Sequence, residues 1–173
     1  MIIRLTARLG EKIGVCPPES LPPAKNPYAD WSAHLFTVGH IQYLLITNTA
    51  TLYSMVMPGK GITTQRTFLK GMSSHIERFL GEQGHQVLYE TYIAPEMAGV
   101  SFSKALNRAV TGSMKEFVLE AKWVLREGGV TPHDVSSLLN EMPMSYIRYD
   151  SPMRALSSLA DSHPPSGKLL RLA

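Results

Sequence analysis

The spacing of apolar and polar residues predicts strands mainly in the first third of the chain. Residues 1–5 form a short apolar run typical of a strand. Residues 31–57 contain three β-branched and aromatic runs separated by turn residues, which predicts a three-stranded antiparallel meander. Its middle run, 41–47, is apolar on both faces, so we expect it inside the sheet. Pro58 and Gly59 end the meander.

Helical spacing dominates after residue 60. Apolar residues three and four positions apart predict helices over 63–83 and 113–127. A Thr-Pro start signal at 131–132 predicts one shorter helix. Pro152 marks the start of another. Residues 86–94 fit the period of a strand and the period of a helix equally well. We therefore leave that stretch unassigned.

Four further segments complete the prediction. Thr6 is placed to cap a brief helix that ends at Gly14, and residues 100–105 have the composition of another strand. Residues 15–30 contain five prolines, which predicts an extended loop over the surface of the domain. The tail 161–173 is rich in proline and polar residues, and we expect it to be flexible.

Together these elements predict an α+β fold, in which an antiparallel sheet of four or five strands carries helices packed on one face. The chain of 173 residues suits one compact domain, which we place at 1–160. Apolar residues make up 44% of the chain and charged residues 18%, which excludes a wholly disordered chain.

The cysteine content and the charge restrict the setting of the protein. The one cysteine, Cys16, has no intramolecular disulfide partner, and with nine methionines it favours a reducing compartment such as the cytoplasm. Because Pro17 and Pro18 follow it, we do not expect helix amides to activate Cys16 as a nucleophile. No stretch approaches the roughly 20 apolar residues that span a bilayer, so we expect no membrane partner. The formal charge of +3 fits either an anionic partner, such as a small molecule or a nucleic acid, or a slightly basic solvated surface.

Residues 107–113 form the first candidate site, because they join a predicted strand to the helix at 113–127. The unpaired amides of a helix start, together with one guanidinium and two hydroxyls, would suit a phosphate or a carboxylate. The candidate anion-binding residues are Arg108, Thr111, Gly112 and Ser113. In the alternative interpretation, Thr111 or Ser113 only caps the helix.

A second group of polar and aromatic residues could meet in a cleft. Residues 144–150 are aromatic and cationic, which suits either a stacking platform for nucleic-acid bases or aromatic rings half-buried at the edge of an element. The cleft candidates are Trp31, Asn48, Ser54, Asn107, Arg148 and Tyr149.

Motifs for specific chemistries are missing from the sequence. The glycine-flanked Lys60 lacks the Walker A spacing, and no serine lies in a Gly-x-Ser-x-Gly elbow. No His or Cys spacing matches a metal site. We therefore expect no metal and no cofactor.

Several motifs carry a family resemblance. They are MIIRLT at 1–6, NPYADW at 26–31, YLLITN at 43–48 and NRAVTGSM at 107–114. The chain resembles a family of small, single-domain bacterial proteins whose function is not known. The resemblance covers residues 1 to about 150 and implies one compact domain, without an activity or a site residue.

The leading hypothesis is a non-enzymatic binding or regulatory module that recognises an anionic ligand or partner. One alternative is a transferase or a hydrolase, in which Asn48, Ser54, Arg108 and Ser113 meet in a cleft. A second alternative is a structural homo-oligomer, in which the strand at 52–57 pairs edge to edge with another copy.

Overall fold

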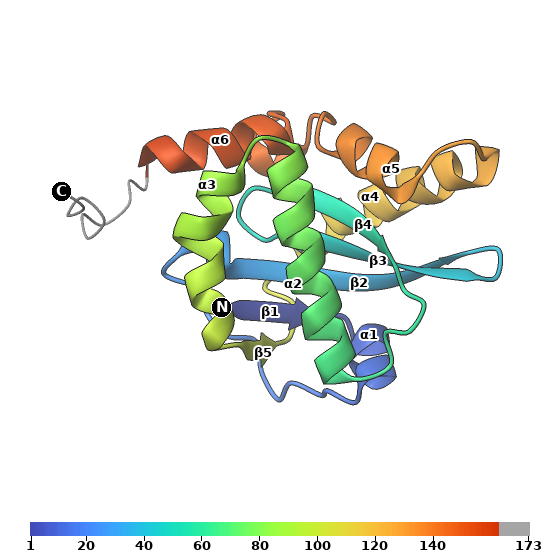
Figure 1. Ribbon diagram of the computed structural model, residues 1–173, viewed down its shortest axis with the longest axis horizontal. Coiled ribbons are helices and arrows are strands. Elements are labelled where there is room, and N and C mark those ends of the chain that lie inside the picture. Colours follow the sequence, from blue (N-terminus) through green and yellow to red (C-terminus); the bar gives the residue numbers. More distant parts are fainter. Residues whose placement is uncertain (163–173) are drawn as a thin grey trace.

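The computed structural model describes residues 1–162, which form a five-stranded sheet between two layers of helices (Figure 1). The strands are β1 (Ile2–Leu5), β2 (Asp30–Val38), β3 (Ile41–Asn48), β4 (Ser54–Pro58) and β5 (Ser101–Ser103). Their order across the sheet is β4-β3-β2-β1-β5. The sheet thus has the expected number of strands, and β3 is an internal strand as its two apolar faces predict.

The helices follow the strands in the chain. They are α1 (Ala7–Ile13), α2 (Gln65–Glu82), α3 (Gln86–Leu88), α4 (Arg108–Glu127), α5 (Pro132–Leu139) and α6 (Pro152–Ser162). Short helical turns lie at Pro27–Ala29, Tyr89–Ile93, Ala94–Ala98 and Ser145–Ile147. Within residues 1–162, no helix has both the length and the apolar character needed to cross a membrane.

The sheet is mixed, so the prediction of a purely antiparallel sheet was wrong. β2, β3 and β4 form the expected antiparallel meander, but β1 pairs in parallel with both β2 and β5. Long connections explain the parallel pairs, because a chain that returns to the same end of a sheet needs a crossover. α1 and the proline-rich loop carry the chain from β1 to β2, and α2 with the helical turns after it leads to β5.

Helices cover both faces of the sheet, which corrects the expectation of one covered face. α2 packs on the face that carries Trp31, Ala33 and Leu35, whereas α4 and α5 pack on the opposite face over Phe36 and Leu45. Figure 1 shows α2 in front of the sheet and α4 behind it. The two layers follow from the strands themselves, since a strand that is apolar on both faces needs cover on both.

Several boundaries differ from the prediction. Residues 86–94, which were left unassigned, are helical. The cap of α2 is Thr64, which forms a capping box with Thr67. The start signal at residues 131–132 is confirmed, because Thr131 caps α5. α6 continues to Ser162, and residues 163–173, which make up most of the expected flexible tail, lie outside the described part of the chain.

The outer edge of β4 is covered by α5. The Asn140 side chain accepts a hydrogen bond from the Ser54 amide at 2.7 Å and donates one to the Ser54 carbonyl at 2.8 Å. The Ser136 hydroxyl accepts from the Val56 amide at 2.8 Å. A second copy that paired edge to edge through residues 52–57 would need free main-chain amides on β4. The amides of Ser54 and Val56 are already bonded to Asn140 and Ser136, so they are not free for such pairing.

Candidate functional site

A buried arginine holds the proline-rich loop against the sheet. Arg4 on β1 is 1% exposed, and its side chain uses every N–H that a guanidinium has. It forms a two-point ion pair with Asp30, with N–O distances of 2.7 and 2.8 Å. It also donates to the carbonyls of Leu21 and Pro22 and to the hydroxyl of Ser103. One side chain therefore joins β1, β2, β5 and the loop.

A pocket of about 440 Å³ lies where β1 and β5 end, and we call it the strand-end pocket. β1 and β5 are parallel, and the carboxyl ends of parallel strands are where open α/β sheets bind ligands. The volume falls in the range of small-molecule sites, which is roughly 300–1,000 Å³. The lining residues are Leu5, Thr6, Ala7, Gly10, Glu11, Val15, Cys16, Pro17, Lys104 and Ala105.

The wall of the strand-end pocket is mainly apolar, with a few polar groups. Lys104 and Glu11 are exposed, and neither side chain has a hydrogen-bond or ion-pair partner among residues 1–162. The Thr6 hydroxyl is buried without a partner in the same range, although Thr6 is the N-cap residue of α1. Cys16 contributes an exposed free thiol. An apolar wall with few polar groups is the usual composition of a ligand site.

Gly10 allows the chain to form this pocket. A Cβ at position 10 would overlap the carbonyl oxygen of Val15, which lies directly over the glycine. α1 ends at Gly14, whose left-handed φ of 71° turns the chain back toward Gly10. The loop that starts there supplies one wall of the pocket.

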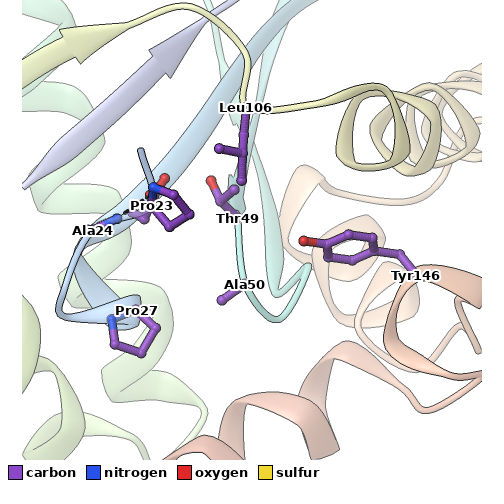
Figure 2. A pocket seen from close by; sticks show the side chains of 8 residues that line it. Pro23, Ala24, Pro27, Thr49, Ala50, Leu106 and Tyr146 are labelled. Carbon is purple, nitrogen blue, oxygen red and sulfur yellow. Dashed lines mark hydrogen bonds between the residues drawn. The ribbon is translucent and has the colours of Figure 1, made fainter. Parts of the chain in front are cut away.

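A smaller cavity of about 120 Å³ lies further along the proline-rich loop, and we call it the Tyr146 pocket. Figure 2 shows the Tyr146 hydroxyl pointing toward Thr49 and Ala50 of the β3–β4 turn. This hydroxyl has no hydrogen-bond partner among residues 1–162, whereas the Asp30 carboxylate is already bound by Arg4 and by the Ala24 amide. The cavity is too small for most metabolites. Its lining residues are Pro23, Ala24, Pro27, Asp30, Thr49, Ala50, Leu106 and Tyr146.

The predicted anion site lacks the expected geometry. α4 begins at Arg108, five residues before the predicted start, and its cap is Asn107, whose side chain accepts from the Val110 amide at 2.9 Å. Gly112 and Ser113 therefore lie inside the helix, where amides bond to carbonyls four residues back. The Thr111 hydroxyl bonds to backbone carbonyls of the same helix. Only Arg108 keeps the expected exposure.

Three of the cleft candidates are structural. Trp31 is fully buried, and its indole N–H donates to the Tyr28 carbonyl at 2.8 Å. Asn48 is fully buried and fixes the β3–β4 turn through bonds to Ala50 and Thr51. Ser54 is fully buried as well. None of the three lines either pocket.

The last two cleft candidates lie on an exposed loop. Arg148 and Tyr149 are exposed, and both adopt a left-handed backbone, with φ of 58° and 63°. A bridge between Met144 and Asp150 closes this loop. Two consecutive non-glycine residues in this conformation are rare. Their side chains do not line the Tyr146 pocket, although Tyr146 belongs to the same loop.

A third hollow, about 360 Å³ and wide open, lies between α2 and α5. His133 of α5 contacts Glu82 of α2 at 3.2 Å, and Arg78 completes the hollow. His75, one turn before Arg78, is half-buried. Burial and the Arg78 guanidinium lower its pKa from 6.5 to about 4. Among the described residues, no group of three His, Cys, Asp or Glu side chains is arranged to hold a metal ion.

The pKa of His75 predicts a loss of stability in acid. Between pH 6.5 and 4 the unfolded chain binds a proton that the folded chain does not, so the free energy of unfolding falls as the pH falls through this range. We expect a loss of about 1–2 kcal/mol, after allowance for solvent at the partly exposed ring. Urea unfolding of His75→Gln at several pH values should show a flatter pH dependence than the unmodified protein. The exposed His40→Gln variant is the control, and an unchanged slope in His75→Gln would contradict the prediction.

Of the residues that line the strand-end pocket, the sequence points to Thr6 only as a helix cap and to Cys16 only as a thiol that helix amides do not activate. Lys104 carries no such signal. Thr6 directly follows the predicted strand at 1–5, whereas Lys104 lies inside the predicted strand at 100–105 and follows β5 only in the structure. The two residues come together because β1 and β5 are parallel neighbours.

The architecture and the pockets define a single-domain α+β protein with a mixed sheet and cavities along one loop. The chain belongs to the family described as a domain of unknown function (DUF6933), whose model matches residues 2–155. This match confirms the resemblance to a family of small single-domain proteins of unknown function. No curated protein and no solved structure matches the chain.

Proposed function

We propose that the protein is a binding module whose strand-end pocket holds a small, mainly apolar molecule with one anionic group. The observation that carries the proposal is the cavity of about 440 Å³ at the ends of two parallel strands. Apolar side chains and backbone form most of its wall, so an apolar ligand body would gain by leaving water there.

Lys104 is the reason for proposing an anionic group on the ligand. Lys104 lines the pocket and its ammonium has no partner among residues 1–162, so a carboxylate or a phosphate could pair with it without displacing another acid. The formal charge of +3 also favours the approach of anions. Glu11, from α1, is the one acidic residue in the wall. It offers a matched control for the role of charge.

The alternative of a transferase or a hydrolase has less support. Asn48 and Ser54 are fully buried and engaged in structural hydrogen bonds, and Ser113 is 5% exposed. None of the three cavities described among residues 1–162 is lined by any of these groups or by Arg108. The binding module therefore remains the better proposal.

Calorimetric titration with octanoate, octanol and octylamine tests this function. These probes share an apolar chain and differ in the charge of the head group. We expect octanoate to bind best, because only its carboxylate can pair with Lys104. Lys104→Gln should weaken octanoate about three- to fivefold, as for an exposed ion pair worth up to about 1 kcal/mol. Glu11→Gln should leave octanoate binding unchanged or stronger.

A variant that fills the pocket distinguishes binding in the pocket from binding elsewhere on the surface. Ala105 is exposed and lines the strand-end pocket, so Ala105→Trp should fill the cavity without disturbing the core. Octanoate binding should then be lost, while the urea unfolding midpoint stays close to that of the unmodified protein. Equal binding of octanoate by the unmodified protein and by Ala105→Trp would refute the site. Stronger binding of octylamine than of octanoate would refute the anionic head group.

A further inference from the structure

α4 presents an apolar stripe to solvent. Leu119 is 69% exposed and Trp123 is 62% exposed, and they lie four residues apart on the helix face directed away from the sheet. On the opposite face of α4, Phe117 and Ala121 are fully buried. A large aromatic side chain left in water on the outer face of a helix marks a surface that a partner can cover.

Charges of opposite sign border this stripe on its two sides. With 3.6 residues per turn, Lys115 and Lys122 fall along one flank of Leu119 and Trp123, whereas Glu120 and Glu127 fall along the other. The partial exposure of Lys122 and Glu120 agrees with a place between the buried and the outward faces. The surface is thus apolar in the middle, basic on one side and acidic on the other.

The spacing of these residues matches a short parallel coiled coil. If Leu119 occupies position d of a heptad, Trp123 occupies the next a position, the two lysines occupy g and the two glutamates occupy e. In a parallel pair, each g residue faces the e residue five positions further along the other helix. Lys115 would face Glu120 of a second copy, and Lys122 would face Glu127.

We propose that α4 pairs in parallel with α4 of a second copy of this chain, burying Leu119 and Trp123 between the two helices. The two-fold axis then runs along the helices, so the basic flank of each copy lies against the acidic flank of the other. An antiparallel pair would instead bring lysine to lysine and glutamate to glutamate. The charges of the two flanks therefore favour a second copy in the parallel orientation.

The structure also indicates the strength of this contact. Glu116 holds the a position before Leu119, and Arg126 holds the d position after Trp123. In a parallel pair like charges therefore meet at both ends of a short apolar layer, which weakens the contact. Such a small interface belongs with weak, transient contacts rather than with obligate dimers. The α4 surface also differs from the covered edge of β4, so it offers a separate route to a homo-oligomer.

Sedimentation equilibrium from low micromolar to near-millimolar protein tests the pairing. We expect a reversible monomer–dimer equilibrium, and Trp123→Glu should weaken it at least about tenfold, because it places a charge in the apolar centre. The control is Val87→Asp, which changes a side chain that is 75% exposed on α3 and should leave the equilibrium unchanged. Circular dichroism checks that each variant is folded. A chain that stays monomeric at every concentration would overturn the proposal.

Charge reversals at one pair determine the orientation. Lys122→Glu alone and Glu127→Lys alone each place like charges together in a parallel pair, so each should weaken the dimer several-fold. The double variant restores opposite charges and should recover the original affinity. If neither single reversal weakens the dimer, the parallel arrangement is refuted.

Discussion

Replacing Arg4 with methionine will lower the free energy of unfolding by about 3–5 kcal/mol, because it leaves the Asp30 carboxylate buried without its partner. Asp30 is 3% exposed and accepts two bonds from Arg4. The variant also leaves the carbonyls of Leu21 and Pro22 without these donors. A loss of this size is a large fraction of the stability of a typical domain, which is about 5–15 kcal/mol.

Urea unfolding followed by circular dichroism measures this effect. The double variant Arg4→Met with Asp30→Leu removes both charges, so it should recover part of the loss. Arg66→Met, at an exposed position of α2, is the control and should stay within about 0.5 kcal/mol of the unmodified protein. A loss below about 1 kcal/mol for Arg4→Met would show that the network does not hold the loop. Since the same loop lines both pockets, the folded variant should also bind octanoate more weakly.

Asn140→Ala will lower the free energy of unfolding by about 2–3 kcal/mol. Asn140 is fully buried, and its side chain satisfies both the amide and the carbonyl of Ser54. Its removal leaves two main-chain groups of β4 without partners, and each unsatisfied buried group costs about 1–3 kcal/mol. The two penalties overlap in part, because water can reach the space that the shorter side chain leaves.

Urea unfolding, combined with hydrogen exchange of the Ser54 amide, tests the Asn140 prediction. We expect faster exchange of this amide in Asn140→Ala, since the edge of β4 is then open. Ser137→Ala, one turn earlier on α5, is the matched control and should change the stability by less than about 0.5 kcal/mol. Unchanged exchange at Ser54 would mean that α5 does not protect this edge.

Strand positions followed from local patterns, but strand pairing did not. Runs of β-branched and aromatic residues located β2, β3 and β4, and the short turns between the runs indicated their antiparallel pairing. β1 gave a clear strand signal too. Its parallel partners, β2 and β5, are separated from it by long crossovers, and no local pattern specifies where a crossover returns.

The start of α4 shows how a helix boundary can be misplaced. Asn107, Thr111 and Ser113 are all residue types that cap helices, so cap preference alone did not choose among them. The burial of Val110 identifies the true start of the helix. Val110 belongs to the same apolar stripe as Met114 and Phe117 and is 1% exposed. Including it places the cap at Asn107 and removes the free amides expected at Gly112 and Ser113.

The candidate site was the hardest part to predict. The strand-end pocket depends on the close approach of Val15 to Gly10 and on the position of Lys104 beside the end of β1. These are properties of backbone paths that meet only in the folded chain. Two of the cleft candidates, Asn48 and Ser54, serve the fold instead.

Alkylation of Cys16 is the most direct measurement of the central claim, which is that the strand-end pocket binds an anionic apolar molecule. Cys16 is exposed, lines that pocket and is the one cysteine of the chain, so its reaction with iodoacetamide reports on this place alone. Octanoate at about ten times its Kd should slow the reaction about tenfold, because only about a tenth of the pockets remain free. The reaction of free glutathione should not change. A rate for Cys16 that stays the same at saturating octanoate would contradict the account.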